Sequence, residues 1–193
     1  LSSAAQYFHI LRRQAKILEQ EQVRPLVIMT PKSMLRNQVM ASTAEEFSEG
    51  SFESFVETKA LGKKPKSVER IVFASGKLAV ELREKAATEK NTDWLQIISI
   101  EEIYPFPFTG VQEALKKYTN LKEIFWAQEE PKNMGAWTFV EPRLNAAAPG
   151  KLSVTYIGRK RRSSPAEGDP LVHKNEQQRI MTQAITRNNE GEK

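Results

Sequence analysis

The sequence predicts an α/β domain of three layers, with helices on both faces of a mainly parallel β-sheet. Two observations support this prediction. Short apolar runs bounded by turn-forming residues, typical of buried strands, alternate along the chain with segments whose apolar residues recur every three or four positions, as in helices. This alternation indicates right-handed crossover connections, which cover both faces of a sheet and make its neighbouring strands parallel.

The first part of the chain predicts two helices and one strand. Residues 4–19 have apolar side chains at helical spacing. A short second helix is predicted at 43–47, and an exposed loop rich in Glu, Ser, Gly and Lys follows it. Between the two helices, residues 25–30 form a short apolar run that is opened by Pro25 and closed by Pro31. A run of this kind is typical of a buried strand.

The remainder of the chain carries the regular alternation. Ser75 and Gly76 form a tight turn between its first strand and its first helix. In chain order we expect a strand at 68–74, a helix at 77–87, a strand at 95–100, a helix at 109–118, a strand at 121–127, an irregular or helical segment at 133–145, a strand at 152–157 and a helix at 175–186.

The composition excludes several classes of protein. Of the 193 residues, 39% are hydrophobic, which allows a sizeable core, and the absence of cysteine excludes disulfides and thiolate metal sites. No apolar run approaches the ~18–20 residues of a membrane-spanning helix, and no signal peptide is evident. The net charge of +5 is spread over the chain, and the one dense basic cluster at 159–162 is a weak nucleic-acid signal. We therefore predict neither membrane nor nucleic-acid binding.

Several predicted loops at the carboxyl ends of strands have residues suited to an anion. Ligands of parallel sheets meet these loops. The turn from Ser75 to Lys77 resembles half of a phosphate site, in which backbone amides at a helix start face the ligand, although the full Walker spacing is absent. The segment from Thr30 to Arg36 is a similar basic turn, and we expect the basic members to converge at one sheet edge. The anion-site candidates are Thr30, Lys32, Arg36, Ser75, Lys77, Gln128 and Lys132.

The sequence contains two histidines, His9 and His173. His9 lies in the first predicted helix, beside Tyr7 and Phe8. A histidine at an apolar helix position is often a packing residue, and the functional alternative is a hydrogen-bond donor or proton carrier near neutral pH. Neither histidine has further ligands at metal-binding spacing, so we predict no metal site. We interpret His173 as a cap or surface residue.

Two segments have the composition of an interaction surface. The run from Tyr104 to Phe108 mixes aromatic residues with proline and has no helical or strand periodicity, and we expect a partner to bury it. The loop from Gln128 to Trp137 contains Glu129 and Glu130, which are either a pair of catalytic acids or, as we favour, part of a loop that fixes a subunit contact. The interface candidates are Tyr104, Phe106, Phe108 and Trp137.

Eight segments of the chain form an ordered series of motifs. They are YFHILRRQ (7–14), RPL (24–26), TPKSMLR (30–36), SGK (75–77), IEEIYPFP (100–107), QEEPKNMGAW (128–137), GR (158–159) and SPA (164–166). Taken in order, these segments closely resemble one family, which is the C-terminal region of the bacterial, thiamine-diphosphate-dependent first component of 2-oxoglutarate dehydrogenase. The resemblance runs from residue 4 to about residue 186, and the block at 128–137 is highly specific.

The resemblance implies a domain organisation and an activity. Residues 1–20 would be the tail of a preceding pyrimidine-binding domain, 21–187 a transketolase C-terminal-like domain, and 188–193 a disordered tail. The full protein would be a cytoplasmic homodimer of the tricarboxylic acid cycle that decarboxylates 2-oxoglutarate on thiamine diphosphate and Mg²⁺. It would pass the succinyl group to the lipoyl arm of the dihydrolipoyl succinyltransferase component.

The resemblance also implies roles for particular residues. The family's histidine in the segment that matches 7–14 lies at the active site near the substrate, which implies a catalytic role for His9. Some relatives bind acetyl-CoA or AMP as effectors on this domain, and the anion-site candidates suit that role. This chain has Ser99 where the family often has arginine, and a hydroxyl does not replace a guanidinium in binding an effector.

The sequence lacks one part of a complete enzyme. The Gly-Asp-Gly start of a thiamine diphosphate site is absent, and Gly168-Asp169-Pro170 does not replace it, so we expect this chain to bind no cofactor and to be inactive alone. One alternative is a purely regulatory domain that binds a nucleotide or acetyl-CoA. Another is a relative of the pyruvate or branched-chain dehydrogenases, but the block at 128–137 and the run from Arg12 to Gln14 favour the oxoglutarate family.

Overall fold

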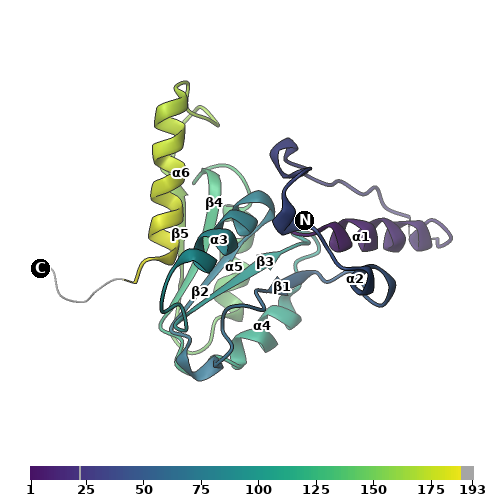
Figure 1. Cartoon of the computed structure of the whole chain (residues 1–193), viewed down its shortest axis with the longest axis horizontal. Helices are drawn as coiled ribbons and strands as arrows, with labels where there is room; N and C mark the ends of the chain where they lie inside the picture. Colours follow the sequence, from purple (N-terminus) through teal and green to yellow (C-terminus); the bar gives the residue numbers. More distant parts are fainter. Residues whose placement is uncertain (22, 188–193) are drawn as a thin grey trace, which may run out of the picture.

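Five strands form one sheet in the order β1-β3-β2-β4-β5 in the computed structural model, which describes residues 1–21 and 23–187 (Figure 1). The predicted tail at 188–193 lies outside the described residues. The strands are β1 (Phe55–Glu57), β2 (Arg70–Ala74), β3 (Leu95–Ile100), β4 (Glu123–Pro131) and β5 (Val154–Arg159). The α-helices of the described part are α1 (Ala4–Ile17), α2 (Ala44–Ser48), α3 (Gly76–Thr88), α4 (Phe108–Lys116), α5 (Trp137–Ala147) and α6 (Pro170–Ile185).

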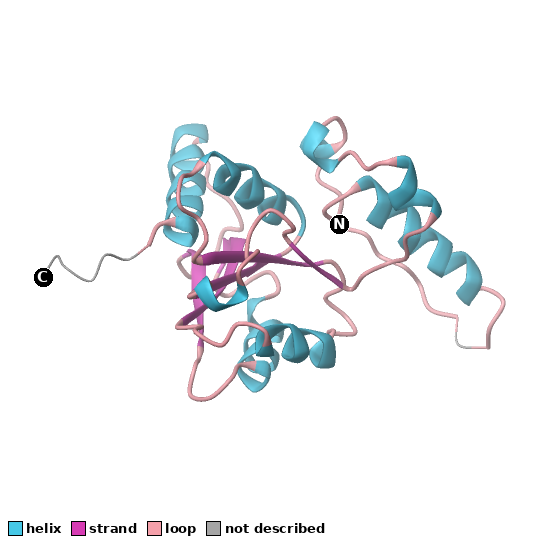
Figure 2. Ribbon diagram, turned by 60° about the horizontal axis from the view of Figure 1, so that its bottom comes forward, coloured by secondary structure: helices cyan, strands magenta, loops and turns pink. Residues whose placement is uncertain are grey.

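The sheet is mainly parallel, as predicted. The strands β2, β3, β4 and β5 pair in parallel, and β1 pairs antiparallel with β3 at one edge. Helices lie on both sides of the sheet (Figure 2). The predicted three-layer α/β class, of the transketolase C-terminal-like kind, is therefore confirmed.

Alternate residues of the central strand β2 face opposite layers. Ile71 and Phe73 join Trp126 in a core that α4 and α5 cover. Val72 and Ala74 join a second core that α3 and α6 cover. All five residues of β2 are buried, as expected of a parallel strand with a helix layer on each face.

The start of α6 differs from the prediction because a capping side chain sets where the helix begins. α6 begins at Pro170, earlier than the predicted start at 175, because the Asp169 side chain accepts hydrogen bonds from the backbone amides of Leu171 and Val172 at 2.8 and 2.9 Å. Proline is well suited to the first helical position, where its missing N–H has no partner to lose. The segment predicted to be irregular or helical, 133–145, overlaps the helix α5, which ends two residues later at Ala147.

The predicted strand at 25–30 is wrong. These residues belong to an irregular connection between α1 and α2, and the side chains of Val27 and Met29 are 80% and 83% exposed. A strand needs a neighbour that pairs with its backbone, and in the described residues no strand pairs with this segment. Conversely, the sequence does not predict β1, because its three residues are too few to show an alternating pattern.

Candidate functional site

His9 is the best-defined candidate, and it lies on the buried side of α1. Its residue is 3% exposed. Nε2 lies 2.7 Å from the backbone carbonyl oxygen of Glu46, and Nδ1 lies 3.2 Å from a guanidinium nitrogen of Arg12. Because a carbonyl can only accept and a guanidinium can only donate, the ring proton is on Nε2 and the lone pair is on Nδ1. Both ring nitrogens therefore have a partner.

The short helix α2 covers His9. Thr43 begins α2 with a capping box, in which the Thr43 side chain accepts from the Glu46 backbone and the Glu46 side chain accepts from the Thr43 backbone. The ring of Phe47 packs edge-on against the ring of Phe8, with centroids 5.5 Å apart. Capping and packing together fix the carbonyl group that His9 contacts.

Two glutamates at the end of β3 hold α1 against the domain. Glu101 accepts a hydrogen bond from the backbone amide of Ser2 at 2.7 Å, and its side chain is fully buried. Glu102 accepts two hydrogen bonds from the guanidinium of Arg13. This role was not predicted from the sequence, although two adjacent acids directly after a buried strand are a signal that could have indicated it. The carboxyl end of β3 thus sets where His9 lies.

A second polar group lies at the carboxyl ends of β2, β4 and β5. Lys77, in the first turn of α3, forms ion pairs with Glu81 at 2.7 Å and with Glu129 of β4 at 3.1 Å. Burial acts to lower the pKa of Lys77, but the hydrogen bonds and charges of the two glutamates outweigh it and raise that pKa above its ordinary value. Ser75 precedes the helix without a side-chain capping bond. Lys77 is therefore neutralised within the chain.

Arg159 is the centre of this group, although the sequence marks it only through the basic cluster at 159–162 and the GR segment at 158–159. It is 2% exposed, and its Nε lies 2.9 Å from both carboxylate oxygens of Glu167. The same guanidinium donates to the backbone carbonyl of Glu129 and lies 3.2 Å from Nδ1 of His173. Burial acts to raise the pKa of Glu167, but the hydrogen bonds from Arg159 outweigh it and the pKa is lowered.

Gln128 holds the loop between β4 and α5 in shape. Its side-chain oxygen accepts from the Trp126 indole at 2.9 Å and from the backbone amide of Trp137 at 3.0 Å, and its side-chain nitrogen donates to the carbonyl of Met134 at 2.8 Å. Trp137 is 4% exposed and belongs to the core. The ammonium of Lys132 lies over the Trp137 ring, 5.7 Å from its centroid. Gln128 and Trp137 thus serve the packing of this domain.

The remaining anion-site candidates lie on the connection between α1 and α2. Thr30 and Arg36 line a groove of about 640 Å³ together with Tyr7 of α1, and Lys32 is exposed nearby in the chain. Among the described residues, no hydrogen bond or ion pair joins these three candidates to Lys77. The structure therefore brings Lys77 and Gln128 to the ends of β2 and β4, and it places Thr30 and Arg36 beside α1.

The aromatic run is only partly exposed. Tyr104 is 75% exposed and contacts the ring of Phe139 on α5, with centroids 6.1 Å apart. Phe108 is 37% exposed, and Phe106 packs against the core beneath α4 and α5. Of the four interface candidates, Tyr104 and Phe108 are thus the ones that a partner could contact.

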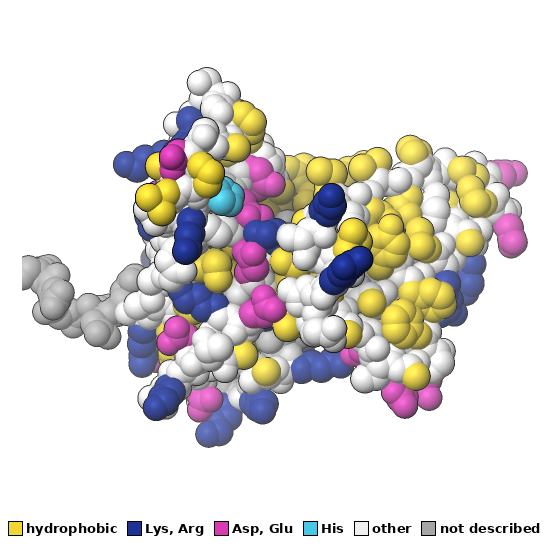
Figure 3. Space-filling view, turned by 45° about the horizontal axis from the view of Figure 1, so that its top comes forward, with side chains coloured by type: hydrophobic (Ala, Val, Ile, Leu, Met, Phe, Trp, Pro, Cys, Tyr) yellow, Lys and Arg dark blue, Asp and Glu magenta, His cyan; other side chains and the backbone are white. Residues whose placement is uncertain are grey.

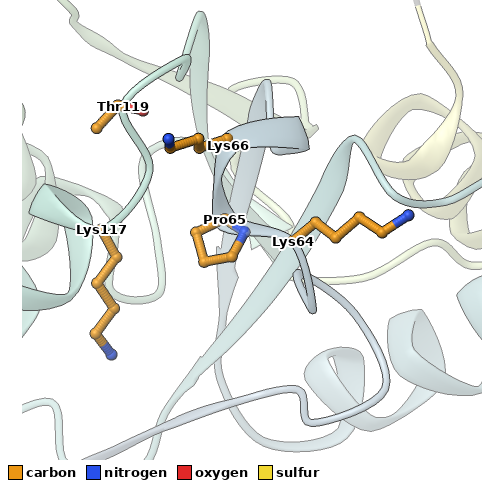
Figure 4. A pocket seen from close by; sticks show the side chains of 5 residues that line it. All are labelled: Lys64, Pro65, Lys66, Lys117 and Thr119. Carbon is orange, nitrogen blue, oxygen red and sulfur yellow. The ribbon is translucent and has the colours of Figure 1, made fainter.

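A cavity of about 360 Å³, lined mainly by the stems of lysine side chains, lies near the amino ends of β2 and β4 (Figure 4). Figure 4 shows the side chains of Lys64 and Lys117 pointing in different directions. Lys117 pairs with Glu57 at 2.6 Å, and Lys64 lies 3.8 Å from Asp93. The residues that line the cavity are Lys64, Pro65, Lys66, Lys117 and Thr119. Parallel sheets bind ligands at the carboxyl ends of their strands, and this cavity lies at the amino ends. We therefore assign no chemistry to it.

The described residues do not fit a thiamine diphosphate and Mg²⁺ site. In residues 1–21 and 23–187, no group of three or more His, Asp or Glu side chains could hold a metal ion. The sequence also lacks the Gly-Asp-Gly start of such a site. No step of cofactor chemistry is therefore assigned to these residues. In the same part of the chain, no helix is long and apolar enough to cross a membrane.

The five-stranded, mainly parallel sheet with its helices is the fold of a transketolase C-terminal-like α/β domain. Residues 41–185 match the family described as 2-oxoglutarate dehydrogenase C-terminal. The chain is 56% identical over 187 residues to the 2-oxoglutarate dehydrogenase E1 component of Geobacillus sp. (strain WCH70). The aligned residues are 97% of this chain and 20% of that protein. It is 54% identical over 190 residues to the protein of the same name from Bacillus subtilis (strain 168), with 98% of this chain and 20% of the relative covered.

The chain belongs to the 2-oxoglutarate dehydrogenase C-terminal family. The resemblance seen in the sequence motifs is thereby confirmed, and the relatives named here are bacterial. The chain spans about a fifth of the length of the curated relatives it matches.

Proposed function

We propose that the chain is the C-terminal domain of a 2-oxoglutarate dehydrogenase and that it completes an enzyme rather than constituting one. The full polypeptide decarboxylates 2-oxoglutarate with thiamine diphosphate and Mg²⁺ in the tricarboxylic acid cycle of the bacterial cytoplasm, and it passes the succinyl group to a dihydrolipoyl succinyltransferase component. One observation carries this proposal. The chain is 56% identical, over 97% of its own length, to a 2-oxoglutarate dehydrogenase E1 component, and it covers 20% of that protein.

A large apolar surface beside α1 supports the view that this domain docks onto further protein. Figure 3 shows hydrophobic side chains gathered on the side of the molecule where α1 and the segment after it lie. Contiguous apolar surface of this kind marks contact sites in soluble proteins. The exposed apolar residues of α1 and this segment are Tyr7, Phe8, Leu11, Leu18, Val23, Val27, Met29, Leu35 and Val39.

We infer that this apolar surface contacts the preceding part of the polypeptide, as expected if residues 1–20 are the tail of a pyrimidine-binding domain and 21–187 the next domain. The exposed rings of Tyr104 and Phe108 then contact the second subunit of a homodimer. The two surfaces are distinct in the chain, because one follows α1 and the other follows β3.

Mixing this chain with the preceding part of a family polypeptide, produced separately, should give a stable complex. Val27→Asp combined with Met29→Asp should weaken that complex at least tenfold, since two carboxylates would be buried in the contact without partners. Val172→Asp on α6 is the matched control, because Val172 is 48% exposed and lies outside this surface. Light scattering after gel filtration gives the mass. If the two parts do not associate, the docking proposal is wrong. If the complex has only one copy of each part, the homodimer proposal is wrong.

His9 has the catalytic role in this proposal. It lies at the junction between α1 and the domain, and it has a lone pair on Nδ1 and a proton on Nε2. A neutral imidazole in this state can accept a proton at Nδ1 and donate one from Nε2. His9 therefore acts on the substrate when the preceding domains are present, and the chain alone is inactive.

The alternative function is effector binding, by acetyl-CoA or AMP, at the carboxyl ends of β2, β4 and β5. The observation that favours it is the gathering of Lys77, Lys132 and Arg159 near these strand ends. Because Lys77 and Arg159 already pair with carboxylates, an anionic ligand there would have to displace the Glu129 side chain from Lys77.

Acetyl-CoA or AMP at millimolar concentration should raise the melting temperature of the chain by a few degrees, since a ligand that binds only the folded state stabilises it. Lys77→Gln should reduce the increase, and Lys117→Gln is the matched control because it also loses a lysine that pairs with a glutamate, at the opposite edge of the sheet. Calorimetry measures the change. A melting temperature that neither compound alters would exclude this alternative.

A further inference from the structure

We propose that the Glu46 carbonyl and the glycine at position 50 together position His9, holding its proton on Nε2 so that Nδ1 is the nitrogen that acts on the substrate. This inference rests on the catalytic role of His9 proposed above. Beyond that role, the geometry points to the ring nitrogen that reacts, the groups that fix the ring, and the chemical class of ligand that meets the ring on its Arg12 side.

The two hydrogen bonds of His9 differ in what they can do. The bond from Nε2 to the Glu46 carbonyl is 2.7 Å long and ends on a backbone group held by the capping box of α2. The bond at Nδ1 is 3.2 Å long and involves an exposed arginine side chain, that of Arg12. A backbone partner at one nitrogen sets the tautomer and orientation of the ring, which leaves the other nitrogen to react. Nε2 is thus the fixed nitrogen.

Gly50 makes this fixed contact possible. A Cβ atom at position 50 would lie 2.5 Å from the Glu46 carbonyl oxygen and 2.7 Å from Nε2 of His9. Both distances are far shorter than carbon makes with oxygen or nitrogen without a bond. Any side chain would therefore push the imidazole away from the carbonyl. Position 50 needs glycine for space beside His9.

Arg12 indicates the class of molecule that Nδ1 meets. Its guanidinium lies 5.5 Å from the centroid of the Phe8 ring, on the same face of α1 as His9, because residues three and four positions apart are neighbours on a helix. A guanidinium beside a lone pair suits an anionic ligand with a carboxylate for Arg12 and an O–H group for Nδ1. 2-Oxoglutarate has the carboxylates, and its 2-oxo oxygen becomes a hydroxyl only when a nucleophile adds to that carbon, so Nδ1 acts on this substrate-derived hydroxyl. When that O–H transfers its proton to Nδ1, the imidazolium keeps its Nε2 proton on the Glu46 carbonyl.

Nitrogen-15 NMR of the 193-residue chain tests the tautomer directly, at a pH where histidine is neutral. With His173→Gln to identify the remaining signals, His9 should show a protonated Nε2 and an unprotonated Nδ1. Gly50→Ala should shift both signals toward the average of the two tautomers, and Gly168→Ala, where a Cβ meets nothing within 4 Å, should leave them unchanged. A proton on Nδ1 in the unsubstituted chain would overturn the inference, even if Gly50→Ala does not fold.

Turnover separates this inference from the proposed function. In a full-length family polypeptide that carries this chain, Gly50→Ala should lower kcat at least tenfold, and Gly168→Ala should leave it unchanged. If His9→Ala does not change turnover, the proposed catalytic role fails. If His9→Ala lowers turnover but Gly50→Ala does not, the role of His9 stands and the positioning by Glu46 and Gly50 is wrong.

Discussion

Replacing His9 with alanine in a full-length family polypeptide that carries this chain should lower turnover of 2-oxoglutarate by about 100-fold or more, the usual contribution of a positioned acid–base group. The reason is that alanine removes both the lone pair on Nδ1 and the proton on Nε2. Steady-state kinetics with 2-oxoglutarate measure the effect, and circular dichroism establishes that the fold is retained.

Two further variants separate chemistry from packing at this position. His9→Gln keeps an N–H group for the Glu46 carbonyl but has no basic nitrogen, so it should be as inactive as His9→Ala while being more stable. His173→Ala removes the other histidine, which lies on the exposed side of α6, and should leave turnover within about twofold of the unsubstituted protein. Normal turnover of His9→Ala would make His9 a packing residue.

The ion pair between Arg159 and Glu167 should have the largest effect on stability. Glu167→Leu leaves the Arg159 guanidinium buried without its carboxylate, and breaking a buried pair in this way costs about 3–5 kcal/mol. Replacing Arg159 with Met in the same variant should recover much of the loss, because no uncompensated charge then stays buried. Urea unfolding followed by circular dichroism measures each free energy.

The contribution of Glu167 should also depend on pH in one direction. Its pKa is lowered in the folded protein by the hydrogen bonds from Arg159, so its stabilisation is present above the ordinary carboxyl value of 4.5 and is lost as the pH falls. The difference between the unsubstituted chain and Glu167→Leu should therefore shrink below that pH. Glu113→Leu, at an exposed position of α4, is the control and should change stability by less than about 0.5 kcal/mol. A difference that grows in acid would contradict this account of the pair.

Local patterns were sufficient for the central sheet and its helices. The alternation of Ile71, Val72, Phe73 and Ala74 between two cores follows from the pleat of a strand, so burial on both faces was predictable. The segment at 25–30 has the same apolar composition but no strand beside it in the described residues. Composition alone does not say whether a partner strand exists, and this explains the wrong prediction there.

The candidate site was less predictable, because its contacts join residues that are distant in sequence. The motif around His9 identified the residue, but its partner is a carbonyl group at Glu46, and any amino acid can supply a carbonyl. Arg159 was grouped with its basic neighbours at 159–162, since no local pattern marks which member of a basic cluster meets a buried carboxylate. Lys77 was predicted at a strand end correctly, but its pairing with Glu129 depends on the order of the strands.

Turnover of 2-oxoglutarate by three samples tests the central claim most directly: this chain alone, the preceding part of a family polypeptide alone, and the two mixed. Each sample receives thiamine diphosphate, Mg²⁺ and an artificial electron acceptor. If the chain completes an enzyme, neither part should react alone and the mixture should. Turnover by the 193-residue chain alone, or equal turnover by the preceding part with and without it, would contradict the claim.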